Sequence, residues 1–171
     1  KPLEVDLQNF KDALSASEST DAFMNAASPG VIAQFQPNQH YPDHSSYLYA
    51  LADAMKVEYE GIAETGLVIQ IDSPDLALGR HVLFKDQSDE EFVTMAELHI
   101  EALNHALQNI PAERLRLHVC WGNYQGPHHC DIEMKKILPT VLKAKPMALS
   151  FEGANPRHSH ESVSYTHLRA P

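Results

Sequence analysis

The chain of 171 residues is long enough for one domain, and its 43% hydrophobic and 21% charged residues are ordinary for a globular protein. Its formal net charge of −10 argues against a nucleic acid or an anionic membrane as partner. It shows no apolar run that could span a bilayer and no signal-peptide pattern, and two cysteines make a poor disulfide framework. We therefore expect a cytoplasmic protein with reduced thiols.

The first part of the chain predicts helix and then strand. Over residues 5–26, Leu7, Phe10 and Leu14 have helical spacing, which predicts two short helical pieces. The residues VIAQFQ, at 31–36, predict the first strand, and a polar loop follows it.

The middle of the chain predicts two strand–helix units. A helix is predicted over about 45–64, and the residues LVIQID, at 67–72, predict the second strand. After a long loop, Ser88 and Glu91 have the spacing of a capping box for a helix that runs to about Asn109.

The last part predicts two further strands around a short helix. The residues LRLHVCW, at 115–121, predict the third strand, and the residues ALSFEG, at 148–153, predict the fourth. Between them we expect a helix that Asp131 caps and that Pro139 kinks or shortens.

The alternation of strands with helices predicts parallel βαβ units. On each predicted strand one alternate set of residues is apolar, and the other set is polar toward the carboxyl end. A parallel sheet between two helix layers would be apolar on both faces, so the pattern favours a barrel with a polar lumen. We predict an α/β fold, a partial (β/α)8 TIM barrel of about four strands, because a full barrel needs about 250 residues.

The end of the chain differs from the rest. Residues 162–171, SVSYTHLRAP, continue neither a helical nor a strand pattern, and they resemble the translated read-through of a transposon sequencing adapter. We therefore predict a barrel domain over 1–161 and a non-native tail over 162–171.

Three residues at strand ends suggest a metal site. His118 and Cys120 are two apart on one strand and share a face, and Glu152 ends the next strand. Neighbouring strands lie about 4.8 Å apart and zinc bonds measure about 2.0–2.3 Å, so these side chains can share one ion. Zinc with an open position would hold a substrate thiol as thiolate. The alternatives are a buried cysteine beside a core histidine, a metal-free decarboxylase-type barrel, and hydrolysis with Asp72 or Asp75 as base.

The segments HVCWGNYQGPHH, LSFEGANPRH, VIQIDSPDLALGRH and NAASPGVIAQFQPNQHYPD resemble the cobalamin-independent methionine synthase family, in its single-barrel branch. The resemblance implies a (β/α)8 barrel, a catalytic zinc, and methyl transfer from a methyltetrahydrofolate to homocysteine sulfur. The family's His-x-Cys motif matches His118 and Cys120, and its glutamate ligand matches Glu152. The Asp of its Ile-Asp-Glu-Pro motif, which contacts the amino acid substrate, matches Asp72, and Ser73 stands in place of the Glu. The family's last cysteine ligand has no counterpart in this chain.

These observations predict a zinc-dependent thiol methyltransferase with a homocysteine-like thiol and a methyltetrahydrofolate-like donor as substrates. Zn²⁺ would lie on His118, Cys120 and Glu152, and Asp72 would orient the thiol substrate. Gln36 and Arg80 are further candidates for substrate binding. The alternatives are an epoxyalkane–coenzyme M type of thiol alkyl transfer and a non-catalytic fragment of a barrel.

Overall fold

A computed structural model describes residues 2–123 and 125–166 of the chain. Its centre is a four-stranded, all-parallel sheet in which neighbouring strands follow chain order. The strands are β1 (Phe23–Ala27), β2 (Val68–Asp72), β3 (Leu115–Val119) and β4 (Ala148–Phe151). A doubly wound sheet reverses its strand order, whereas a (β/α)8 barrel adds each strand beside the last. The predicted α/β partial barrel is confirmed, and over the described residues the sheet does not close.

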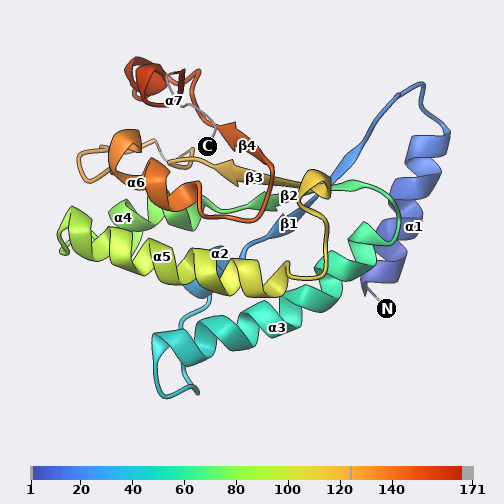
Figure 1. The fold of residues 1–171 in the computed structure, drawn as a ribbon, viewed down its shortest axis with the longest axis horizontal. Coiled ribbons are helices and arrows are strands. Elements are labelled where there is room, and N and C mark those ends of the chain that lie inside the picture. The colour runs from blue at the N-terminus through green and yellow to red at the C-terminus, as the bar shows by residue number, and fades with distance from the viewer. Residues whose placement is uncertain (1, 124, 167–171) are drawn as a thin grey trace.

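The helices are α1 (Pro2–Ser15), α2 (Pro29–Phe35), α3 (His44–Ala63), α4 (Leu78–Val82), α5 (Asp89–Ala106), α6 (Met134–Val141) and α7 (Val163–Thr166). Three 3-10 turns join them: η1 (Pro74–Leu76), η2 (Ala112–Arg114) and η3 (Ser159–Ser162). Figure 1 shows α3 and α5 side by side along one side of the sheet. None of the described helices combines the length and the apolar character that a membrane crossing requires.

The hydrophobic core lies between the sheet and these helices. On β3, Leu115, Leu117 and Val119 are buried, while Arg116 and His118 between them are half-buried. Burying a leucine or valine side chain stabilises the fold by about 1.5–3 kcal/mol. The apolar phase of the strand therefore faces the helices, and the polar phase faces the opposite, open side.

Two of the predicted helices are confirmed. Helix α3 begins at His44, and Asp43 caps it by accepting a hydrogen bond from the Ser46 N–H at 2.7 Å. Helix α5 begins after the predicted capping box, in which Ser88 and Glu91 bond each other's backbone. These caps satisfy N–H groups that have no partner within the helix.

The predicted first strand is wrong. Residues 31–36 belong to helix α2 and its C-cap, and the first strand is β1, most of which lies in the region 5–26 that was predicted as helical. The physical reason lies just before the apolar run. The Ser28 hydroxyl accepts a hydrogen bond from the Val31 N–H at 3.0 Å, and Pro29 occupies the first turn, where its fixed φ suits a helix.

The last predicted helix is shorter than a cap at Asp131 would make it. Helix α6 begins at Met134 with Glu133 at the N-cap position, and Pro139 lies inside it. Of the tail predicted as non-native, residues 162–166 lie in η3 and α7, and residues 167–171 lie outside the described part of the chain. That the tail is non-native stays a prediction.

Candidate functional site

The polar face of the sheet brings together residues from three strands. Asp72 is the last residue of β2, and it pairs in register with His118 of β3, which pairs with Ser150 of β4. Residues in register on neighbouring parallel strands point to the same face. Cys120 and Glu152 follow directly after β3 and β4.

A pocket of about 400 Å³ lies at the carboxyl ends of these strands. Its lining residues are Asp72, Pro74, Leu78, His118, Cys120, Gly122, Asn123 and Glu152. The three residues predicted as zinc ligands and the predicted substrate contact Asp72 therefore share one pocket. It lies at the end of the strands where (β/α)8 enzymes place their active sites.

The histidine in this pocket has two polar neighbours. Its Nδ1 lies 3.3 Å from the Ser150 hydroxyl, and its Nε2 lies 3.9 Å from the Asp72 carboxylate. The side chains of His118 and Asp72 are 26% and 49% exposed. Because the distance of 3.9 Å exceeds that of a hydrogen bond, both groups remain available to a ligand in the pocket.

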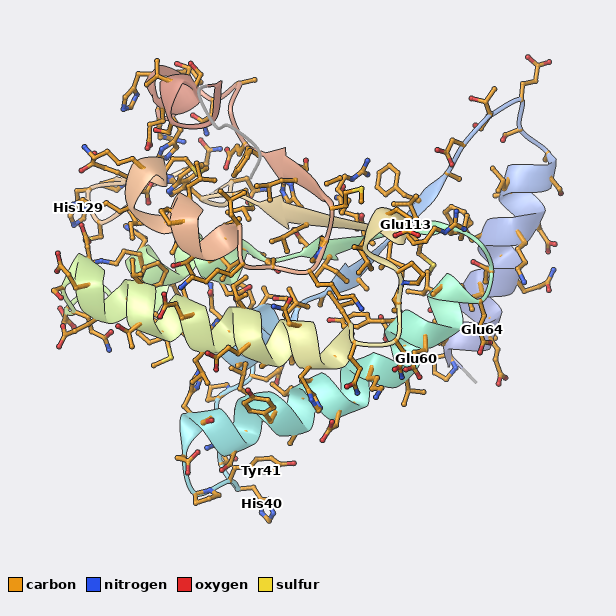
Figure 2. The ribbon with its side chains drawn as sticks, in the orientation of Figure 1. His40, Tyr41, Glu60, Glu64, Glu113 and His129 are labelled. Atoms are coloured by element: carbon orange, nitrogen blue, oxygen red, sulfur yellow. The ribbon has the colours of Figure 1, made fainter. Side chains whose placement is uncertain are left out.

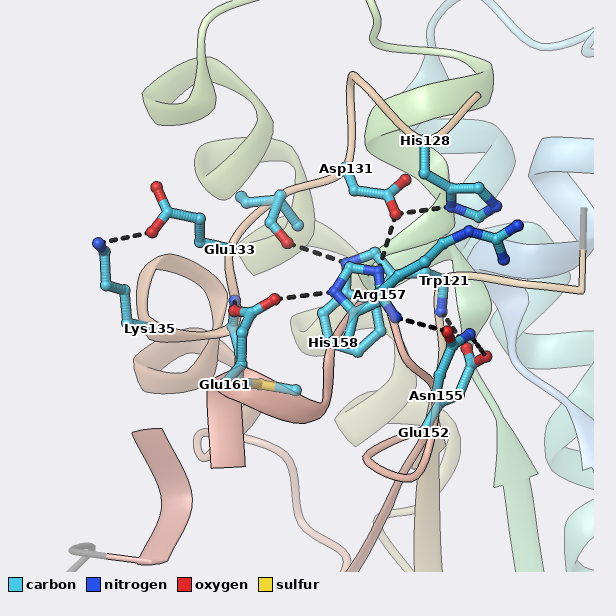
Figure 3. A network of polar contacts seen from close by, with 12 residues as sticks. Trp121, His128, Asp131, Glu133, Lys135, Glu152, Asn155, Arg157, His158 and Glu161 are labelled. Atoms are coloured by element: carbon cyan, nitrogen blue, oxygen red, sulfur yellow. Dashed lines mark hydrogen bonds and ion pairs between the residues drawn. The ribbon is translucent and has the colours of Figure 1, made fainter. Parts of the chain in front are cut away.

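Glu152 is held in place through both of its carboxylate oxygens (Figure 3). One oxygen accepts a hydrogen bond from the Trp121 backbone N–H at 3.0 Å, and the other accepts one from the Asn155 side-chain amide at 2.6 Å. Trp121 itself is buried, and its indole N–H donates to the Ile132 carbonyl at 2.9 Å. A carboxylate that its neighbours orient in this way resembles the supported ligands of metal sites.

The thiol of Cys120 lies in an anionic environment. Burial raises the pKa of Cys120, and the carboxylates of Asp72, Glu152 and Asp75 add to the rise, while the Gly122 backbone N–H opposes it. A divalent cation bound among these groups would reverse that balance, because a coordinated thiol loses its proton. The donor set of imidazole, thiol and carboxylate is one that zinc uses, so these residues fit the ion.

The two further candidates for substrate binding lie elsewhere. Gln36 follows helix α2, is exposed, and uses its backbone carbonyl to accept the Tyr47 hydroxyl at 2.8 Å. Because 31–36 is not a strand, the loop after it does not start at the carboxyl edge of the sheet. Figure 2 shows His40 and Tyr41 at the tip of that loop, pointing away from the sheet.

Arg80 takes part in the packing of its own loop. Its guanidinium donates to the Asp89 carboxylate at 3.1 Å and to the Phe84 carbonyl at 2.9 Å, and it is not among the residues that line the pocket. A role for Arg80 or Gln36 toward substrate stays a prediction.

A second polar cluster, the Asp75 network, lies in the helix layer and was not predicted. The Asp75 carboxylate accepts from the Ser28 hydroxyl at 2.7 Å and contacts His99 Nδ1 at 2.8 Å. The other ring nitrogen of His99 lies 3.0 Å from His44 Nε2. Asp75 is 2% exposed and is not among the residues that line the pocket, so of the two aspartates considered as a base for hydrolysis only Asp72 lies there. His99 lies among the buried residues of α5, and nothing in the sequence around it points to Asp75.

The fold and the pocket define an α/β protein of partial-barrel architecture with a His, Cys and Glu pocket at its strand ends. A methionine synthase from Saccharolobus solfataricus is 29% identical to the chain over 154 residues, which is 87% of the chain and 42% of that protein. One from Saccharolobus islandicus (strain L.S.2.15) is 30% identical over 75% of the chain and 35% of its own length. One from Pyrococcus abyssi is 32% identical over 56% of the chain and 25% of its own length.

The chain is a homologue of these methionine synthases, and it spans less than half the length of these curated relatives. No family model matches the chain. No solved structure matches it either.

Proposed function

We propose that the protein represented by this chain is a zinc-dependent methyltransferase that moves a methyl group to a thiol, as in methionine synthesis. The relatives named methionine synthase support this reaction class, and the pocket supports the chemistry. The chain covers 42% of the Saccharolobus solfataricus protein, so the activity is proposed for a longer protein that contains this segment.

One observation carries the proposal. His118, Cys120 and Glu152 come from two neighbouring strands and their ends, and all three line the same pocket. Zinc sites in enzymes use three protein ligands of these types and keep one position open. Bound there, zinc would lower the pKa of a substrate thiol, so that a thiolate nucleophile exists at neutral pH.

The remaining residues of the pocket suggest how the substrate is held. Asp72 is half exposed, lies in register with His118, and presents a carboxylate to the pocket. An amino acid substrate carries an ammonium group, which a carboxylate binds through charge-assisted hydrogen bonds. We assign Asp72 to orienting the thiol substrate. The methyl donor would enter from the open side of the sheet, a methyltetrahydrofolate-like molecule being the one that the family resemblance implies.

The two cysteines are consistent with a thiol chemistry in a reducing compartment. Cys120 and Cys130 are both free, and only Cys120 lines the pocket. This difference supplies a matched pair of variants, because the same change can be made inside and outside the proposed metal shell.

The test is metal content and activity of the longer protein with the change Cys120→Ser. Cys120→Ser is expected to lose the zinc ion of the pocket and methyl transfer together, because a serine hydroxyl is a far poorer zinc ligand than a thiolate. Cys130→Ser is the control and should keep both. Asp72→Asn should keep zinc and raise the KM for the thiol. Unchanged zinc content in Cys120→Ser rejects the metal assignment.

The acceptor thiol is decided in the same assay. Homocysteine with a methyltetrahydrofolate and coenzyme M with an epoxide are offered to the same preparation. Product only from the second pair would replace methyl transfer by thiol alkyl transfer. If the protein contains no zinc and acts on neither pair of substrates, the result favours the alternative of a metal-free, decarboxylase-type barrel.

The opposing hypothesis, a non-catalytic fragment, concerns the 171-residue chain alone. Its four-stranded sheet has open edges at β1 and β4, and unpaired edges favour aggregation. A sharp, cooperative melt of the monomeric chain would count against that view.

A further inference from the structure

A second cluster of metal-type ligands lies between the loop after β3 and the loop after β4 (Figure 3). It consists of His128 and Asp131 from the first loop and His158 from the second. One ligand atom from each residue lies within 4.8 Å of the others. We propose that His128, Asp131 and His158 form a second metal site, which holds a divalent transition-metal ion of the zinc type.

The distances within this cluster are short. The Asp131 Oδ2 atom lies 2.7 Å from His128 Nδ1 and 2.9 Å from His158 Nε2. All three side chains are at least nine-tenths buried, with exposed fractions of 7%, 6% and 7% for His128, Asp131 and His158. Zinc bonds of about 2.0–2.2 Å to nitrogen and oxygen would fit among these atoms after small side-chain movements.

An unpartnered oxygen points to a ligand at this place. The second carboxylate oxygen of Asp131, Oδ1, is buried and has no hydrogen-bond partner among the described residues. Leaving a buried carboxylate oxygen unpaired is costly, and native proteins avoid it. A cation bound by Asp131 would supply the missing partner.

His158 is oriented as a metal ligand would be. Its Nδ1 lies 2.8 Å from the Glu161 carboxylate, which leaves Nε2 facing Asp131. The other Glu161 oxygen accepts a hydrogen bond from the Met134 backbone N–H. The ring stacks on Trp121, with 3.9 Å between centroids and 11° between planes. Metal-bound histidines commonly donate their other ring N–H to a carboxylate, which fixes the tautomer and the ring orientation.

The donor set narrows the identity of the ion. Two imidazoles and one carboxylate suit zinc and its neighbours in the transition series, and they are too rich in nitrogen for magnesium or calcium. Sulfur is absent from the set, in contrast to the pocket with Cys120. This difference makes the two sites distinguishable by spectroscopy.

The site would act on the pocket through residues that contact both. The His158 backbone N–H donates to the Asn155 carbonyl at 3.0 Å, and Asn155 donates to Glu152 at 2.6 Å. Trp121 also reaches both sites, since its ring stacks on His158 and its backbone N–H bonds Glu152. An ion here would therefore tie the two loops together and steady the carboxylate in the pocket.

The test uses the 171-residue chain with Cys120→Ser, which removes the thiolate from the pocket. Equilibrium dialysis with Zn²⁺ should still show one bound ion per chain, and zinc should raise the Tm. Adding Asp131→Asn or His128→Gln should weaken zinc binding at least tenfold and abolish the rise in Tm. His129→Ala, an exposed neighbour, is the matched control and should change neither.

Cobalt gives a readout that needs no second variant. Co²⁺ in the Cys120→Ser chain should show ligand-field absorption without a thiolate charge-transfer band. The inference is overturned if the Cys120→Ser chain binds no zinc, or if it binds zinc with an affinity that Asp131→Asn and His128→Gln leave unchanged. Loss of zinc from the pocket alone leaves the second site intact, so the two proposals fail separately.

Discussion

Asp72 and Asp75 are three residues apart, and each lies beside a histidine, yet the structure uses them in opposite ways. The Asp72 carboxylate is 3.9 Å from His118, and its side chain is 49% exposed. The Asp75 carboxylate is 2.8 Å from His99, and its side chain is 2% exposed. A histidine beside an aspartate is therefore no signature of a functional site by itself.

The difference follows from where the chain turns. Asp72 ends β2 with its side chain on the open face, whereas Asp75 lies in η1, where the chain has turned toward the helices. Both oxygens of Asp75 have partners within the fold, from Ser28 and His99. Buried groups with all their partners stabilise a structure, and half-exposed groups with unfilled capacity can meet a ligand.

The largest expected effect is on the stability of the chain. Asp75→Ala should lower the free energy of unfolding by about 3–5 kcal/mol, because it leaves His99 and the Ser28 hydroxyl buried without their partner. Asp72→Ala should change it by about 0.5 kcal/mol or less, as at other exposed positions. Urea denaturation of both variants measures the contrast.

Asp75→Asn refines the result, since it keeps the shape and one acceptor of the carboxylate. Its free energy of unfolding should lie between that of the wild type and that of Asp75→Ala. If Asp72→Ala and Asp75→Ala lower the free energy of unfolding equally, the claim that only Asp75 stabilises the fold is wrong.

The next effect comes from Gly30, which lets α2 approach the Asp75 network. A Cβ at this position would lie 2.0 Å from Asp75 Oδ2 and 2.5 Å from His99 Nδ1. Gly30→Ala should therefore cost about 1–3 kcal/mol, as overpacking of a core does. Gly79→Ala is the matched control, because its Cβ would meet neighbours only from 3.4 Å, and it should cost little. If Gly30→Ala and Gly79→Ala melt at the same temperature, the Asp75 network accommodates the added methyl group without loss of stability.

Local pattern was sufficient to predict much of the sheet from the sequence. The strands β2, β3 and β4 lie where alternation of apolar residues predicted them. The polar phase of the same strands predicted the residues that line the pocket, since a period of two fixes the face of each side chain. These properties depend on residues close together in the chain.

The error at residues 31–36 shows the limit of periodicity. A short apolar run fits a strand and a buried helix equally well, and Val31 and Ala33 are buried in α2. The deciding signal was Ser28 followed by Pro29, which is an N-cap and first-turn pair rather than a turn.

The buried polar clusters could not be predicted because their members meet only through the fold. Asp75 and His99 are 24 residues apart, and Asp131 and His158 are 27 apart. No local rule pairs them. Their burial also depends on how loops and helices pack over the sheet, which apolar spacing alone does not determine.

The smallest expected effect is a dependence of the free energy of unfolding on pH. It comes from His44, which contacts His99 of the Asp75 network. Burial lowers the pKa of His44, the nearby His99 lowers it further, and Asp43 opposes the shift. The folded state thus resists protonation of His44, so stability is fully present above the unfolded pKa of about 6.5 and declines as the pH falls toward the lower folded pKa. His44→Gln, which keeps a polar group toward His99, should flatten this decline in urea melts between neutral and mildly acidic pH. An unchanged slope would mean that the sensitivity resides in another group, and a steeper one would reverse the sign assigned to His44.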